Sequence, residues 1–146
     1  MIAAAVRNAL LPSLVLRTQL SEWDFGNTLL PAIFDLDLAP EKAETPFILV
    51  NTVGSADNEE AESREDDAIE AVVDVNIWEE KGESRLRLST IAWEVFEVLR
   101  DARGVLVLDG WTVTEATCST PTYLRDKDGF PGAVVQARIV AVRERS

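Results

Sequence analysis

The sequence predicts an α+β fold, in which a small, mostly antiparallel sheet carries one central amphipathic helix and an N-terminal helix. The first observation is an apolar alternation with period two, typical of a strand with one face on a core: Ile69, Ala71, Val73, Val75 and Ile77. The second is a helical apolar face soon after it: Leu88, Ile91, Ala92, Val95, Val98, Leu99 and Ala102. Short connections between most predicted strands favour antiparallel pairing, with the helices on one face.

The N-terminal third of the chain predicts a helix followed by two strands. Apolar residues recur at helical spacing: Ile2, Ala5, Val6, Ala9 and Leu10. Pro12 ends or kinks this helix, and residues 14–20 can restart it. Residues 21–27 are predicted to form a loop. Alternating apolar residues then predict strands over 31–38 and 46–53.

The central strand ends at Trp78, and a turn at 81–83 leads into the central helix. Ser84 is available as the N-cap of this helix, and Gly104 is predicted to stop it in the left-handed conformation. Three further strands are predicted, over 105–108, 111–120 and 132–143. Asp126, Lys127, Asp128 and Gly129 form a predicted hairpin-like turn before the last of them.

Length and composition limit the function classes. At 146 residues, with 47% hydrophobic content, the chain is expected to fold as a single domain over 1–146 without a metal or disulfide. It has one cysteine, Cys118, and no histidine, which excludes histidine-dependent nucleophile pairs and histidine metal sites. The uncharged apolar stretches are too short for a membrane span, and residues 1–16 lack the early basic region and the small-residue cleavage site of a signal peptide, so we expect a soluble protein made in the cytoplasm.

An acidic segment over 54–67 breaks the composition of the chain. It contains seven carboxylates: Asp57, Glu59, Glu60, Glu62, Glu65, Asp66 and Asp67. With Arg64 as its one cation, the segment carries −6 of the total net charge of −12. We expect a mobile loop between two strands, either a solvated hairpin tip or a functional projection. The net charge itself argues against general binding to nucleic acid or anionic membranes.

Two weaker motifs have simpler explanations. Asp35 and Asp37 have the spacing of a metal-binding pair, but two such common residues are better read as outward carboxylates at a strand edge. Cys118 lies beside Ser119 and Thr120 with no base nearby in sequence, and it is better read as a structural thiol. The sequence therefore predicts no catalytic residue, no cofactor and no metal.

Several aromatic and apolar residues exceed what one sheet face requires. Leu86, Trp93 and Phe96 widen the apolar arc of the central helix to roughly 240° at about 100° per residue. Leu86 and Trp93 are expected to contact either the N-terminal helix or a neighbouring subunit. Trp78 lies on the strand face opposite the core, where aromatic residues are common anchors of protein contacts. These four residues are therefore candidates for a subunit interface.

The order of these segments resembles the tail terminator, or tail-completion, proteins of long-tailed bacteriophages and of related prophage and gene-transfer-agent particles. The resemblance covers most of 31–143. Its segments are TPFILV at 45–50, VVDVNIW at 72–78, GESRLRLSTIAWEVFEVL at 82–99, and the DKDG hairpin with its final Val-Val-x-Ala-Arg strand. It implies a small α+β domain that forms a ring, usually a hexamer, which caps the tail tube and joins the tail to the head.

This resemblance implies a non-enzymatic virion protein in the neck between head and tail. Its implied partners are further copies of itself, the tail tube protein and a head-closure or connector protein. DNA would pass through the ring without specific binding, and the acidic segment would line the lumen or face the tube. Two other functions stay open from the residues alone: an acidic inhibitor or immunity-type protein that masks a basic partner, and an enzyme using metal bound only by Asp and Glu.

Overall fold

The computed structural model describes residues 2–35, 40, 43–53, 68–83 and 85–144. Three helices are described: α1 (Ile2–Leu10), α2 (Leu14–Gln19) and α4 (Arg85–Leu99). The strands are β1 (Glu22–Asp24), β2 (Leu29–Pro31), β3 (Ile33–Asp35), β4 (Phe47–Thr52), β5 (Ala68–Trp78), β6 (Trp111–Cys118), β7 (Thr122–Arg125) and β8 (Pro131–Arg143). This combination of helices and strands confirms the predicted α+β class.

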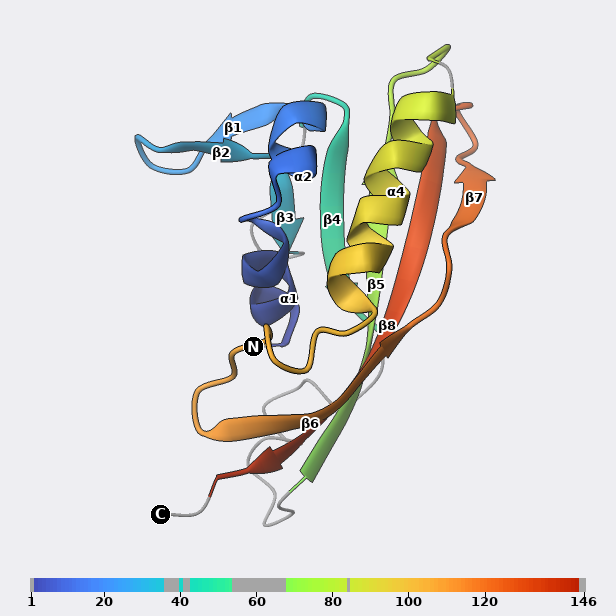
Figure 1. Ribbon diagram of the computed structural model, residues 1–146. Helices are drawn as coiled ribbons and strands as arrows, with labels where there is room; N and C mark the ends of the chain where they lie inside the picture. The colour runs from blue at the N-terminus through green and yellow to red at the C-terminus, as the bar shows by residue number, and fades with distance from the viewer. Residues whose placement is uncertain (1, 36–39, 41–42, 54–67, 84, 145–146) are drawn as a thin grey trace.

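The main sheet has six strands. Five follow the order β3-β4-β5-β8-β6, and the sixth, β7, also pairs with β8. Every pairing in it is antiparallel except that of β3 with β4. The longest ladder joins β5 to β8 from Ala68–Val142 to Trp78–Gly132. Strands β1 and β2 form a separate hairpin that projects from the side of the molecule (Figure 1).

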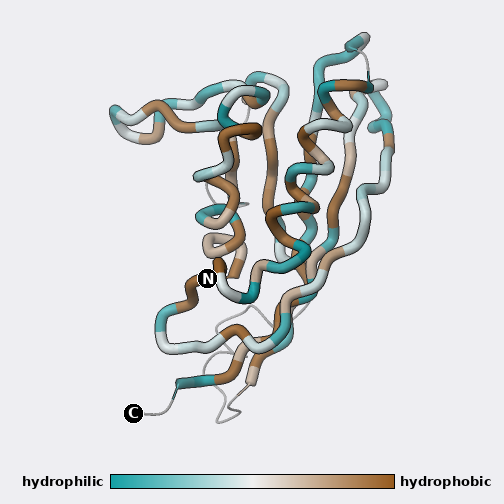
Figure 2. The backbone as a smooth tube through the Cα atoms, viewed as in Figure 1, coloured by the Kyte–Doolittle hydropathy of each residue, from teal (hydrophilic) through white to brown (hydrophobic). Residues whose placement is uncertain are grey.

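The helices cover one face of the sheet, and α4 runs along β5 and β8 (Figure 1). The predicted core face of β5 is confirmed, because Ile69, Ala71, Val73, Val75 and Ile77 are all buried. The predicted apolar face of α1 is also buried in full. Figure 2 shows the underlying alternation as bands of hydrophobic and hydrophilic residues along the helices and long strands. The opposite face of the sheet carries no helix of the described chain, as Figure 1 shows.

The junction between β5 and α4 contains a buried ion pair. Glu79, which directly follows β5, is fully buried, and Arg87 on α4 donates to both of its carboxylate oxygens at 2.7 and 2.6 Å. The backbone N–H of Glu80 donates a third hydrogen bond, at 2.7 Å. The Glu79 backbone N–H donates to the carbonyl of Pro131 at the start of β8. The Glu79 side chain therefore links α4 to the end of β5.

The structure corrects several boundaries. Residues 21–27 are not all loop, because β1 lies within them and pairs with β2. Its turn places Gly26 and Asn27 at positive φ (69° and 74°), the conformation of a tight type I′ hairpin, and this dipeptide was the available signal. Strand β7 was also missed, while the turn over 126–129 is confirmed by its pairing into β8 and by Gly129 at φ 86°.

The predicted strand over 105–108 is wrong. Leu106 and Leu108 are buried while Val105 and Val107 are exposed, so the alternation is real. However, the backbone N–H groups of Val105 and Leu106 both donate to the carbonyl of Ala102, which makes this segment a turn. Only Leu108 forms an isolated bridge, to Trp111.

The predicted helix stop is also wrong, because α4 ends at Leu99 and Gly104 is not among the glycines with positive φ. Arg100 and Arg103 therefore lie beyond the helix. The predicted N-cap Ser84, and the second half of the predicted strand over 31–38, lie outside the described residues.

Removing the arginine of the buried pair tests its contribution. We expect Arg87→Met to lower the free energy of unfolding by about 2–3 kcal/mol, because it leaves the Glu79 carboxylate buried without its cation. This is below the usual range for a fully buried pair, since the Arg87 side chain is 37% exposed. Urea denaturation followed by circular dichroism measures the change. Arg138→Met is the matched control: its pairs are on the surface, and it should change stability little. Equal losses in the two variants would contradict a special role for the buried pair.

Candidate interaction site

The outer face of α4 carries apolar side chains that the described part of the chain leaves exposed. Leu86 is 76% exposed and Trp93 is 44% exposed, while Phe96 is half-buried. The Trp93 and Phe96 rings meet edge to face, with centroids 5.4 Å apart and an interplanar angle of 77°. The Arg100 guanidinium lies 6.0 Å from the Phe96 centroid. The indole of Trp93 therefore packs against Phe96, and Arg100 packs against the Phe96 ring.

The N-terminal helices contact α4 without covering this face. Ser13, the N-cap of α2, donates its hydroxyl proton to the Glu94 carboxylate at 2.5 Å. Helix α2 thus lies against the flank of α4. Leu86 and Trp93 remain exposed beside it. The N-terminal helix, one of the two neighbours expected for Leu86 and Trp93, therefore does not bury them.

Trp78 lines a groove on the opposite face of the sheet. The groove has a volume of about 300 Å³ and is lined by Ala43, Thr45, Phe47, Trp78, Asp126 and Phe130. Strand register builds its floor, because Phe47 on β4 is directly opposite Trp78 on β5. Trp78 in turn is opposite Gly132 on β8. A Cβ at position 132 would lie 2.7 Å from Trp78 Cζ3, so the indole can lie across β8 only because this residue is glycine.

The groove wall at Phe47 belongs to a larger aromatic cluster. The Phe47 and Phe34 ring centroids are 6.3 Å apart, and Phe34 is fully buried beneath Trp23 and Phe25 from the β1–β2 hairpin, at 5.8 and 5.5 Å. Arg7 on α1 lies over the Phe25 ring at 4.7 Å. Arg7 Nε also donates to the carbonyl of Ile33 at 2.6 Å. The hairpin is therefore packed onto the edge of the sheet that supports the groove.

The rim of the groove is polar and uses most of its carboxylates internally. The Asp126 carboxylate accepts the backbone N–H groups of Asp128 and Phe130, both at 2.9 Å. Glu80 accepts the hydroxyl of Thr45 at 2.5 Å. Lys127 is exposed in the same turn as Asp126. Lys81 is also exposed, and its stem lies beside Gly129.

Further along the open face, polar side chains bond across the strands. Arg138 on β8 donates to Glu70 at 2.8 Å and to Glu115 at 3.0 Å, and Gln136 donates to Asp74 at 2.9 Å. The hydrogen bond to Glu70 is the main cause that raises the pKa of Arg138 above its usual value. This part of the face is a set of satisfied polar pairs, unlike the aromatic groove.

The described residues show no assembled catalytic centre. Cys118 is half-buried, its thiol lies 3.7 Å from the carbonyl of Phe96, and burial is the main cause that raises its pKa. A thiol with a raised pKa is a poor nucleophile at neutral pH. Asp35 ends β3, but its predicted partner Asp37 lies outside the described residues. Within the described ranges, no three acidic or cysteine side chains gather as metal ligands.

A second cavity, of about 430 Å³, lies between the start of α4 and β7. The Arg85 guanidinium lies 4.8 Å from the Tyr123 ring at this cavity, and the Tyr123 hydroxyl meets Ser89 at 3.1 Å. These contacts attach the short strand β7 to the helix.

None of the described helices is both long and apolar enough to cross a bilayer.

The predicted site residues fall into three groups. Leu86, Trp93 and Phe96 lie together on α4, and Trp78 lies on the far side of the sheet. The seven acidic residues Asp57, Glu59, Glu60, Glu62, Glu65, Asp66 and Asp67 lie outside the described residues. Phe47 and Phe130 were not predicted as site residues, because only strand pairing and the hairpin turn bring them to Trp78.

Comparison with known proteins identifies a family for this chain. The family model described as Tail completion protein gp17 matches residues 4–141. None of the curated proteins compared with the chain matches it. The match covers nearly the whole chain, including the helix face, the groove and the strands between them. The chain therefore belongs to the family of phage tail completion proteins, which are structural proteins of the virion tail.

Proposed function

We propose that this protein is a tail terminator that forms a ring, a hexamer, which caps the finished tail tube and joins it to the head. Membership of the tail completion family is the observation that carries this proposal. Its partners are further copies of itself, the tail tube protein and a head-closure or connector protein. It acts without catalysis in the neck of the virion, after synthesis in the host cytoplasm, and the whole chain over 1–146 forms one domain.

The exposed apolar surfaces support assembly with other copies. Leu86, Trp93 and Phe96 on α4, and Trp78 in the groove, are proposed as subunit-interface residues. Soluble proteins rarely keep contiguous apolar surface exposed without a contact that uses it. A ring requires such a contact on each side of every subunit.

The charge of the chain supports passage of DNA through the ring. A net charge of −12 repels the phosphate backbone, so DNA would move through without being held. The acidic segment, Asp57 to Asp67, has two proposed positions in the assembly. It lines the lumen, where it would keep DNA from adhering, or it faces the tube, where it would meet basic groups.

Trp93→Asp tests the assembly. We expect a folded monomer that forms neither rings nor caps on tail tubes, because a carboxylate on this face would have to be desolvated in the contact. Light scattering after size exclusion measures the mass, and circular dichroism checks folding. Val107→Asp, which adds the same charge at a residue 81% exposed outside α4, should assemble normally. An unfolded Trp93→Asp protein would place Trp93 in the monomer core and contradict the interface assignment.

Duplex DNA should not bind measurably at physiological salt. Each phosphate contact needs a cation, and carboxylates outnumber Lys and Arg in this chain by 26 to 14. A gel shift with short duplexes tests this expectation. Retardation at submicromolar protein would refute it.

Replacing residues 57–67 with a short Gly/Ser turn tests the acidic segment. Thermal stability should be nearly unchanged, because loop length affects stability only logarithmically. The yield of infectious or DNA-transferring particles should fall, because the segment acts in assembly or DNA passage. A control of equal length, with all seven carboxylates changed to amides, separates charge from length. Normal particle yield from both variants would show that the segment is only a solvated hairpin tip.

A further inference from the structure

The two apolar features described above lie on opposite faces of the molecule and differ in shape. One is the convex row of Leu86 and Trp93 on the outer side of α4, and the other is the concave groove at Trp78 on the open face of the sheet. We infer that the contact between neighbouring copies is heterologous: the α4 row of one copy packs into the aromatic groove of the next. This inference rests on the proposed ring and names the two surfaces that would build it.

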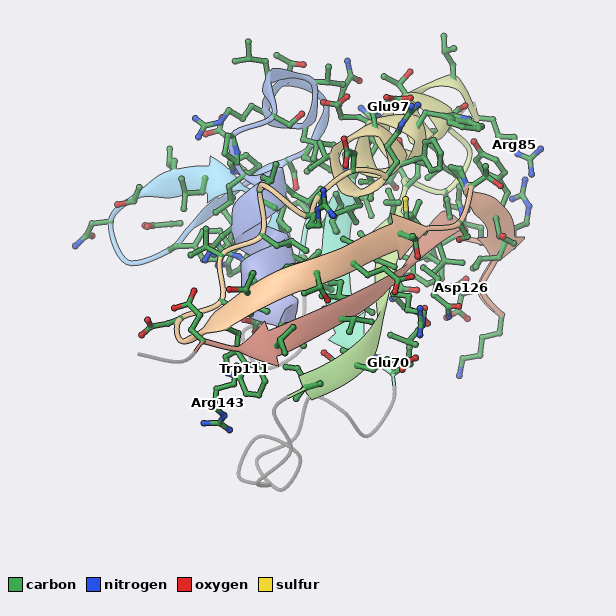
Figure 3. All side chains as sticks on the ribbon, turned by 60° about the horizontal axis from the view of Figure 1, so that its bottom comes forward. Glu70, Arg85, Glu97, Trp111, Asp126 and Arg143 are labelled. Carbon is green, nitrogen blue, oxygen red and sulfur yellow. The ribbon has the colours of Figure 1, made fainter. Side chains whose placement is uncertain are left out.

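Ring closure favours this pairing over contact between identical surfaces. A two-fold contact joins the same patch on two subunits and ends at a dimer, whereas a ring requires two different, complementary patches on each subunit. The helix layer and the open sheet face provide such a pair, because the sheet separates them within one copy (Figure 1). Glu97 on α4 and Asp126 beside the groove likewise project from separate parts of the molecule (Figure 3).

The sizes of the two features agree. The groove volume of about 300 Å³ can hold one large side chain, being at the low end of the volumes of roughly 300–1,000 Å³ that hold small ligands. Trp93 is the largest exposed side chain on α4, and its indole would meet Phe47, Trp78 and Phe130. Aromatic rings in such clusters gain from edge-to-face and offset contacts beyond the area they bury. Leu86, seven residues before Trp93, lies on the same side of the helix about 10 Å along its axis.

The charges beside the two features are also complementary. Glu97 follows Trp93 by one helical turn and is 56% exposed, held only by a 3.4 Å contact with Arg100. Lys81 and Lys127 are exposed near the groove, together with Asp128 in the same turn as Lys127, while the Asp126 and Glu80 carboxylates there accept hydrogen bonds from their own surroundings. Seating Trp93 in the groove would bring Glu97 toward these lysines. In a chain with a net charge of −12, two cations at one edge of an apolar groove favour a partner that presents a carboxylate there, and Glu97, one helical turn from Trp93, is such a carboxylate.

A mixing experiment tests the pairing directly. The helix variant is Trp93→Asp and the groove variant is Phe130→Asp; each keeps one working surface. We expect each variant alone to be monomeric at concentrations where the unmodified protein assembles. An equal mixture should give a dimer of one copy of each and no larger species, because the groove of the first accepts the helix of the second. Native mass spectrometry resolves the species, and circular dichroism confirms that both variants fold.

Charge exchange provides a second test that leaves the aromatic residues in place. Lys81→Glu with Lys127→Glu should raise the dissociation constant of the assembly about tenfold, because it replaces the attraction of two lysines for Glu97 with repulsion. Adding Glu97→Lys should restore much of this loss. Arg17→Glu, which reverses an exposed cation on α2, is the control for added negative charge and should have a smaller effect.

The outcomes separate this inference from the ring itself. If the unmodified protein stays monomeric at high concentration, both the ring and the contact are refuted. If it assembles and the lysine variant assembles equally well, or if the two aspartate variants fold but do not associate in the mixture, the ring stands and the pairing of helix with groove is overturned.

Discussion

The buried carboxylate of Glu79 is the constraint on which both exposed surfaces depend. Its side chain fixes α4 through Arg87, and its backbone N–H fixes the first residue of β8. The next residue of β8 is Gly132, on which Trp78 lies. The orientation of the outer face of α4 and the floor of the groove are therefore set within a few residues of one another. Burying such an ion pair costs desolvation free energy. The pair still fixes a specific geometry, because all three hydrogen-bond donors to the Glu79 carboxylate are well placed.

Regular periodicity made the centre of the fold predictable. Strand β5 and helices α1 and α4 carry their apolar residues at periods of two and 3.6, and these predicted faces are buried, except that Val98 on α4 is half-buried. The prediction failed where backbone hydrogen bonding, rather than side-chain pattern, decides the structure. Val105 to Leu108 alternate as a strand would, but the N–H groups of Val105 and Leu106 close a turn on Ala102. The β1–β2 hairpin was missed because its strands are short and only the Gly26–Asn27 turn marks them.

The candidate site was predictable in part for the same reason. The excess apolar arc of α4 is a local property, so Leu86 and Trp93 could be found from spacing alone. The groove is a nonlocal property: Phe47, Trp78 and Phe130 come from three segments that only the sheet register and the turn after β7 bring together. Glu79 gave no sequence signal either, since an acidic residue after a strand usually faces solvent. Its burial follows from Arg87, eight residues later on a helix whose direction the sequence does not specify.

Net charge limits how such subunits can meet. Copies that each carry −12 repel one another, but at physiological ionic strength this repulsion is screened beyond about 8 Å, so it acts mainly between groups near the contact. The contact must therefore exclude most carboxylates and contain what cations the surface can supply. The aromatic groove combines an internally bonded Asp126 with two neighbouring lysines, beside the exposed Asp128, whereas the polar ladder around Arg138 has already paired its charge within one copy. In the proposed ring, a strongly acidic subunit would thus contact its neighbours through the groove while its remaining surface repels DNA.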